Sequence, residues 1–216
     1  MNNWISNIPN LPALSKGSHA EDSQEMCAME MVAFMERLPH SDSPTCTCPV
    51  LASYVRELND SMLNDRRQDL KQVLPMLVGT TNPSLVQARA EYFAMQAVTK
   101  IVPPALVGII DQALIDDMCT AKNLEDAAHA ARDASDAAHA AHAAYTATRA
   151  ANYAAFAAYY TAADAASAVA YTADAAADTD VWALAIQVLI EAIELDPEIK
   201  PVQWSSERIA DAVSIA

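Results

Sequence analysis

The chain contains little glycine, few aromatic residues and no proline across a long central stretch. Its 216 residues include three glycines, and aromatic residues make up 6%. Tight β-hairpin turns need positive φ angles, which glycine adopts most readily, so three glycines are too few for a fold made of hairpins. No proline lies between Pro104 and Pro197, so little in that stretch forces a helix to end. The sequence therefore predicts an all-α fold.

Long apolar runs and an excess of positive charge are also missing. No run approaches the roughly 20 apolar residues of a membrane span, and Met1 to Leu14 lacks the basic start and hydrophobic stretch of a secretory signal. A formal net charge of −15 disfavours direct binding to nucleic acid, which depends on Lys and Arg. We expect a cytoplasmic protein without a membrane or nucleic-acid partner. An acidic surface suits a basic protein partner or, as a minor alternative, DNA mimicry.

The order of helix signals predicts three parts. Residues 1–21 are expected to form an irregular N-terminal arm in which Trp4, Ile5, Leu11 and Leu14 dock. Residues 22–120 are expected to form a helical bundle. Residues 121–216 are expected to form a long alanine-rich helix and C-terminal helices, which pack on the bundle or on a second copy of the chain.

Local signals place several helix ends. Asp22 and Glu25 have capping-box spacing and predict the start of the first helix. Pro49 predicts the start of the second, and Gly79 is expected to end the third. An apolar run from Val181 to Ile193 predicts a closing helix that ends at Asp196-Pro197.

The alanine-rich segment from Leu124 to Asp178 would be about 80 Å long as one helix. It is therefore expected either to project as a rod or to break near residues 145–152, where threonine and asparagine weaken the helix. One side carries close-packing alanines, which include Ala147, Ala150 and Ala154. The opposite side is bulky and is predicted to be an interaction face for self-association: Tyr145, Arg149, Tyr153, Phe156 and Tyr160.

One part of this segment, Thr161 to Thr172, resembles the threonine-led, eleven-residue repeats of short helical fish antifreeze proteins. The match covers a single repeat, because Ala150 and Ala183 stand where the neighbouring threonines would be. Ice binding is therefore a minor alternative, and alanine packing is the plainer reading.

Four potential metal ligands lie close together in the N-terminal half. Cys27, His40, Cys46 and Cys48 are the donor types of a Cys₃His zinc site. Their spacing lacks the paired Cys-x₂₋₄-Cys knuckles of structural zinc sites, so free thiols in a reducing compartment are the alternative to a zinc cofactor.

A second candidate is a polar cluster made of Glu30, Asp42, Asn59 and Asp60. Glu30 stands beside the apolar face of the first helix, and a buried carboxylate needs a partner. The expected partners are the loop amides around Ser41-Asp42, or Arg66 and Arg67. The cluster is interpreted either as a small-ligand, metal-binding or hydrolytic site or as a structural brace. No phosphate-binding glycine loop or hydrolase motif is present.

The segment from residue 27 to residue 60 resembles the opening of an uncharacterised family found in actinobacteria and their phages. The shared pattern is Cys-x-Met-Glu, then Ser-Asp-x-Pro-x-Cys, then Leu-Asn-Asp, and it continues through Leu-Val-Gly at 77–79 into an alanine-rich helix. It falls on Cys27, Met29, Glu30, Ser41, Asp42, Pro44, Cys46, Leu58, Asn59 and Asp60. The resemblance implies no activity, and its pattern omits His40 and Cys48. The leading hypothesis is therefore a non-enzymatic interaction or assembly protein that self-associates, and the resemblance includes a phage-encoded origin among its implications.

Overall fold

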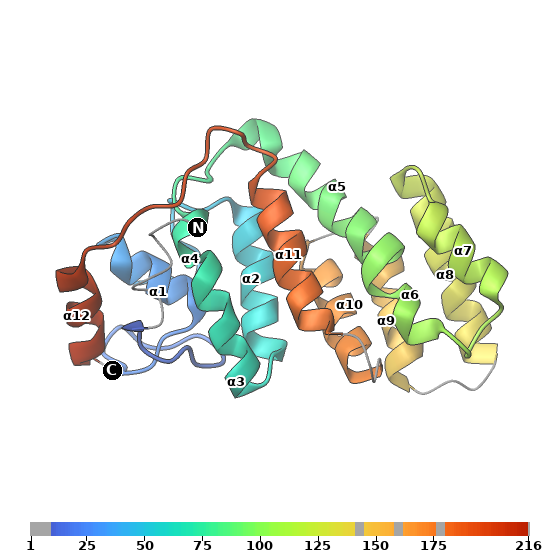
Figure 1. Cartoon of the computed structure of the whole chain (residues 1–216), viewed down its shortest axis with the longest axis horizontal. Coiled ribbons are helices and arrows are strands. Elements are labelled where there is room, and N and C mark those ends of the chain that lie inside the picture. The colour runs from blue at the N-terminus through green and yellow to red at the C-terminus, as the bar shows by residue number, and fades with distance from the viewer. Residues whose placement is uncertain (1–9, 141–144, 158–161, 176–179, 216) are drawn as a thin grey trace. The chain divides into compact units, whose positions relative to one another are not determined.

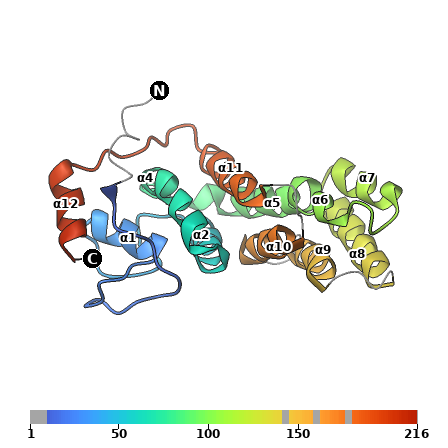
Figure 2. The same cartoon turned by 60° about the horizontal axis from the view of Figure 1, so that its bottom comes forward.

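The computed structural model of the chain is all-α, as the sequence predicted (Figures 1 and 2). It describes residues 10–140, 145–157, 162–175 and 180–215. Within these ranges the only extended pairing is an isolated parallel bridge between Leu14 and Met26. No helix in the described ranges is both long enough and apolar enough to cross a membrane.

The chain divides into two compact units. Unit 1 comprises residues 1–86 and 193–216, and unit 2 comprises residues 87–192. This division differs from the predicted boundary between residues 120 and 121. The difference arises because the segments between residues 97 and 120 contact the alanine-rich helices that follow them, so they belong to the same unit.

Unit 1 is built from short helices around a core rich in methionine and leucine. In chain order its elements are α1 (Ala28–Met35), α2 (Pro49–Ser61), α3 (Asn64–Arg67), the 3₁₀ helix η2 (Gln68–Val73), α4 (Leu74–Leu77), the 3₁₀ helix η3 (Pro83–Leu85) and α12 (Ser206–Ile215). The start of α2 at Pro49 is as predicted, because proline suits a first helical position. Gly79 follows α4 with φ +79°, a value that favours glycine.

The N-terminal arm runs against α1 and α2, and its residues 11–27 form no helix. Leu11 and Leu14 are buried, and Gln68 binds the backbone of Leu14 through both its amide oxygen and its amide nitrogen. Trp4 and Ile5, which were expected to dock with them, lie outside the described residues. The predicted helix start at Asp22 is wrong: Asp22 lies in a turn, and α1 begins at Ala28.

The C-terminal helix α12 is attached to the end of α1. The last turn of α1 contains no basic residue. Arg208 supplies the missing cation: its guanidinium donates to the carbonyl oxygens of Phe34 and Met35 and lies 4.1 Å from the centre of the Phe34 ring. Nearby, the indole Nε1 of Trp204 donates to the Glu36 carboxylate at 2.7 Å. Free carbonyls at a helix end are favourable sites for a cation, so these contacts link the two ends of unit 1's sequence.

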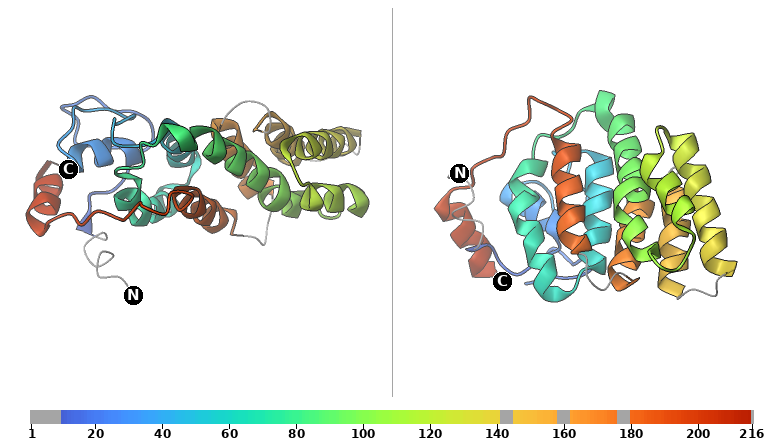
Figure 3. Two further views of the ribbon diagram at one scale, coloured as in Figure 1. Left: turned by 90° about the horizontal axis from the view of Figure 1, so that it is seen from above. Right: turned by 45° about the vertical axis from the view of Figure 1, so that its right-hand side comes forward.

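Unit 2 is built from helices (Figure 3). Alanine dominates its buried residues. Its elements are α5 (Val86–Gln96), the π-helical segment η4 (Ala97–Ile101), α6 (Pro103–Leu106), α7 (Gln112–Thr120), α8 (Leu124–Ala140), α9 (Tyr145–Ala157), α10 (Ala162–Ala175) and α11 (Val181–Ile193). The closing helix α11 begins at Val181, where the apolar run begins, but it ends at Ile193, before the predicted end at Asp196-Pro197. Arg89 of α5 is buried, and its Nε donates to the Ala192 carbonyl at the end of α11.

The alanine-rich segment does not form a single rod. It forms α8, α9 and α10, of which α9 packs against both of the others. The alternative prediction, a break near residues 145–152, agrees with the division into separate helices, although residues 145–152 themselves lie within α9. Threonine and asparagine each cost a helix only about 0.7 kcal/mol. Burial of Ala147, Ala150 and Ala151 within this stretch outweighs that cost.

The predicted close-packing face is buried within the chain. Ala147, Ala150, Ala154 and Ala165 are buried, and so are Ala127, Ala131, Ala134 and Ala138 of α8. The segment η4 contacts α8, α9 and α10 and buries Val98 and Ile101. Since alanine projects only a methyl group, the helix backbones can approach one another closely. This face therefore serves folding of unit 2.

Replacing one of these alanines tests the close packing. We expect Ala150→Leu to destabilise the protein by about 1–3 kcal/mol, because the extra atoms have no space at a fully buried position. Ala113→Leu on the exposed side of α7 is the matched control and is expected to change stability by about 0.5 kcal/mol or less. Urea unfolding followed by circular dichroism measures both. Equal midpoints for the two variants would contradict the packing described here.

Candidate functional site

The candidate site is built around the first turn of α1. Cys27 is the N-cap of this helix, and its Sγ accepts a hydrogen bond from the backbone N–H of Glu30 at 3.5 Å. In return, Glu30 Oε2 accepts the backbone N–H of Cys27 at 2.8 Å. This is a capping box with a thiol in the position where a hydroxyl or carboxylate is usual. It satisfies two backbone donors that the helix itself cannot pair.

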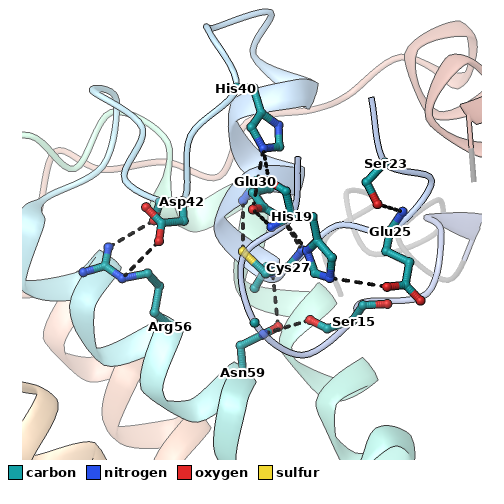
Figure 4. Close-up of polar contacts among 12 residues, drawn as sticks. Ser15, His19, Ser23, Glu25, Cys27, Glu30, His40, Asp42, Arg56 and Asn59 are labelled. Carbon is teal, nitrogen blue, oxygen red and sulfur yellow. Dashed lines mark hydrogen bonds and ion pairs between the residues drawn. The ribbon is translucent and has the colours of Figure 1, made fainter. Parts of the chain in front are cut away.

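Two histidines surround the Glu30 carboxylate (Figure 4). The carboxylate accepts the backbone N–H of His19 at 2.7 Å and lies 2.8 Å from His19 Nδ1. His40 Nε2 lies 2.8 Å from the His19 carbonyl oxygen and 3.6 Å from Glu30 Oε1. A carbonyl oxygen only accepts, so His40 Nε2 carries hydrogen; the same reasoning puts hydrogen on His19 Nδ1. On its other side, His19 Nε2 faces Glu25 at 3.6 Å.

Asn59 and Asp60 of α2 hold the same region from the opposite side. Asn59 Oδ1 accepts the backbone N–H of Ala28, and its Nδ2 donates to the Ser15 carbonyl at 2.9 Å. Asp60 Oδ1 accepts the N–H of Gly17 at 2.8 Å and a hydrogen bond from Asn59 Nδ2. The two residues therefore connect α2 to the start of α1 and to the arm.

Burial closes this cluster to solvent. Glu30 is 1% exposed, Asn59 0% and Cys27 3%. The carboxylate oxygens of Glu30 and the amide of Asn59 are occupied by hydrogen bonds to the chain itself. Buried polar groups with satisfied partners rigidify a fold. These contacts join the N-terminal arm to α1 and α2, and the structural brace stays a prediction for the cluster as a whole, because Asp42 takes no part in them.

The electrostatics of Glu30 agree with this role. Burial raises the pKa of the Glu30 carboxyl. The hydrogen bonds from the Cys27 and His19 backbone and from the His19 ring lower it by more, so the net pKa lies below its ordinary value. Glu30 is thus held as a carboxylate. A general acid at neutral pH needs the opposite shift.

The Cys27 thiol is held in the opposite, protonated state. Burial, opposed in part by backbone hydrogen bonds, raises its pKa to about 12. The nucleophilic form of cysteine is the thiolate, so this thiol is a poor nucleophile at neutral pH. Burial also raises the pKa of Cys46.

The partners predicted for Glu30 were wrong. The observed partners come from the N-terminal arm, whereas the predicted partners were the loop around Ser41-Asp42 or Arg66 and Arg67. Arg67 instead donates to the backbone carbonyls of Asn59 and Met62. His19 is the key residue that the sequence reading missed, because an isolated histidine in an irregular segment carries no periodic signal.

Asp42 lies at the edge of the loop between α1 and α2, and its side chain is 43% exposed. Its carboxylate faces Arg56 of α2 at 4.0 Å, and Arg56 also donates to the Asp42 backbone carbonyl at 3.0 Å. Asp42 therefore ties the loop to α2, separately from the hydrogen bonds around Glu30 (Figure 4).

The predicted zinc ligands have other contacts. His40 binds the His19 carbonyl, and Cys46 Sγ lies 3.8 Å from the Thr47 hydroxyl. The backbone N–H of Cys48 donates to the Thr80 hydroxyl. In the part of the chain that the structure describes, no group of three or more His, Cys, Asp or Glu side chains is placed to hold a metal ion.

The predicted interaction face on α9 makes contacts inside unit 2. The Tyr153 ring stacks on Tyr171 of α10, with centroids 5.3 Å apart, and Arg149 donates to the Tyr153 hydroxyl at 2.7 Å. Arg149 also lies 5.4 Å from the Tyr171 ring centre, within the range of a cation–π contact. The side chains of Tyr145 and Phe156, and all of Tyr160, lie outside the described part of the chain.

Thr172, one of the two threonines in the antifreeze-like repeat, is fully buried, and its hydroxyl donates to the Ala168 carbonyl. It does not present a hydroxyl to the surface. Its counterpart Thr161 lies outside the described residues. The observed position of Thr172 therefore argues for alanine packing in this segment.

Substitution of Glu30 tests the brace and its pH dependence. Glu30→Gln is expected to lower the free energy of unfolding by about 1–3 kcal/mol at pH 7, because buried donors lose a charged acceptor. The folded pKa of Glu30 lies below its ordinary value of 4.5, so its contribution is present above that pH and is lost as the pH falls through the folded pKa. The difference between wild type and variant should therefore shrink as the pH falls below the ordinary value of 4.5 and through the lower folded pKa.

The control is Glu25→Gln, since the Glu25 side chain is 69% exposed. Its stability is expected to stay within about 0.5 kcal/mol of the wild type. Urea unfolding at several pH values measures both variants. A difference for Glu30→Gln that stays constant from pH 7 to pH 2 would exclude the carboxylate as the stabilising group.

Alkylation of the thiols tests the closure of the site. At pH 8, iodoacetamide should modify the exposed Cys119 first, although partial burial and Asp116 raise its pKa. Cys27 should stay unmodified until the protein unfolds, because it is buried and its pKa is raised to about 12. Peptide mass spectrometry over time resolves the order. Early modification of Cys27 would show that the cluster opens readily.

Comparisons with known proteins found no relative of this chain. No family model, no curated protein and no solved structure matches the chain. Its function must therefore be argued from its own residues.

Proposed function

We propose that the chain is a non-enzymatic helical interaction protein that binds a positively charged protein partner through the outer surface of α7 and α8. The observation that carries the proposal is an acidic surface with an exposed apolar edge. From Val107 to Ala140 the sequence contains seven carboxylates and two cations, Lys122 and Arg132. All seven carboxylates are exposed: Asp111, Asp116, Asp117, Glu125, Asp126, Asp133 and Asp136.

The apolar edge lies at the turn between α6 and α7. Val107 is 63% exposed, and the following Ile109 and Ile110 are half-buried. Protein interfaces combine an apolar contact with a polar rim, and charge complementarity selects the partner and speeds its association. An acidic rim around an apolar contact suits a partner with Lys or Arg around an apolar side chain.

Under this proposal the candidate site in unit 1 has a structural role and keeps unit 1 folded. Cys27, Glu30, Asn59 and Asp60 belong to the pattern that resembles the actinobacterial and phage family, and in this chain they hold the arm against α1 and α2. Under this proposal the shared pattern preserves a folded unit, and the hydrolytic alternative receives no support from these contacts.

Self-association was the other expectation for the partner. Two features weigh against self-association through α9 and the alanine face. Arg149 and Tyr153 contact Tyr171 within the chain, and the alanines are buried. Two copies would also bring acidic surfaces together. A basic partner is therefore favoured over a second copy.

A cationic amphipathic peptide with alternating Lys and Leu residues is the probe for this surface. The test variant replaces Asp116, Asp117, Asp133 and Asp136 with Asn, which removes four charges from α7 and α8. It is expected to weaken peptide binding about tenfold at low salt, because each exposed charge contributes a few tenths of a kcal/mol. Fluorescence anisotropy measures the affinity.

The matched control replaces Asp22, Asp65, Glu198 and Glu207 of unit 1 with amides, so its net charge changes equally. We expect this control to weaken binding less than about twofold. Equal losses in the two variants would mean that the peptide recognises net charge alone, and the proposed surface would be wrong. Light scattering on the wild type at low and high salt reports self-association in the same samples.

A further inference from the structure

A pocket of about 210 Å³ lies in unit 1 beside the brace. Its apolar lining comes from Met26 at the end of the arm and from Phe34 and Leu38 at the end of α1 and just beyond it. Its polar lining is Glu21, Ser23 and His40. The pocket therefore combines an apolar surface with a few polar groups, as small-molecule sites do.

The polar groups favour acceptance of hydrogen bonds. Glu21 is exposed and carries a carboxylate, which only accepts. His40 Nε2 donates to the His19 carbonyl, and in the tautomer that carries hydrogen on Nε2 alone, Nδ1 is an acceptor. No Lys or Arg is among the described residues that line the pocket.

Neighbouring charges reinforce this preference. The buried Glu30 carboxylate lies 3.6 Å from His40 Nε2. Arg37, which precedes Leu38 in the chain, is exposed. Arg208 lies over the Phe34 ring, but its guanidinium is engaged by the carbonyls of Phe34 and Met35 and by Asp211 at 3.6 Å. An anionic ligand would meet the carboxylate of Glu21, whereas a cation would be attracted to it.

We propose that this pocket binds a small organic cation, an ammonium group carried on an aromatic or aliphatic body. The body packs on Met26, Phe34 and Leu38, and the ammonium donates to the Glu21 carboxylate and to His40 Nδ1. An ammonium is a donor-only group, so it complements acceptors, whereas a carboxylate only accepts and would find no donor in the Glu21 carboxylate or in His40 Nδ1. This site is independent of the acidic surface on α7 and α8.

Benzylammonium is the probe, and benzyl alcohol is its neutral counterpart of nearly the same shape. Titration of each into the full-length protein is followed by NMR of the methionine and leucine methyl groups. Benzylammonium is expected to shift the signals of Met26 and Leu38 and to bind about three to ten times more tightly than the alcohol. Equal affinities, or an absence of shifts at both residues, would overturn the proposal.

Two variants locate the interaction. Glu21→Gln should weaken benzylammonium binding about three to ten times and leave the alcohol unchanged, because only the charge is lost. Glu125→Gln, on exposed α8, is the matched control and should change neither affinity. Leu38→Trp should fill the pocket and abolish binding of both probes, with circular dichroism confirming the fold. An unaltered affinity in Glu21→Gln would refute the assigned role of the carboxylate.

A second hollow on α12 provides an internal control in the same spectra. It has a volume of about 400 Å³, and none of the described residues that line it is ionisable: Asn10, Ser206, Ile209, Ala210, Val213 and Ser214. Any binding there should not favour benzylammonium over the alcohol. A preference for the cation at Ile209 or Val213 equal to that at Met26 would show that the selectivity reflects net charge, which would also overturn the proposal.

Discussion

Unit 1 depends on one buried carboxylate. Glu30 stands in the first turn of α1 and accepts hydrogen bonds from the residue that caps the helix and from the arm eleven positions earlier. A buried, unpaired carboxylate would be costly, so these donors and the carboxylate require one another. The start of α1, the path of the arm and the position of His40 all follow from satisfying this group.

Unit 2 depends on a different constraint, the small size of alanine. An alanine-rich helix has little apolar area per residue to bury, so its stability in a fold comes from close approach to neighbours. The chain meets this condition by folding α8, α9 and α10 against one another and against η4. The bulky residues Arg149, Tyr153 and Tyr171 then pack with one another between α9 and α10. A projecting rod would leave the alanine face in water.

The two candidate surfaces for function use the same property, an excess of negative charge, in different ways. On α7 and α8 the carboxylates are exposed, and Val107 before α7 is exposed as well. In unit 1 a single carboxylate, Glu21, stands at a small pocket with an apolar lining. The first arrangement suits a broad basic surface, and the second suits one compact cation. The brace contributes to the pocket by fixing the orientation of His40.

The sequence by itself determined the features that depend on near neighbours in the chain. Scarce glycine excluded hairpins, Pro49 marked the start of α2, the apolar run gave the start of α11, and helical periodicity identified the alanines that are buried. Tertiary structure alone decided the features that join distant residues. His19 pairs with Glu30, Arg208 caps α1 from more than 170 positions away, and the alanine-rich segment folds back on itself. Helix capping and periodicity act within a few residues, whereas the partner of a buried charge or of a free helix end is whichever group the folded chain brings within hydrogen-bond distance.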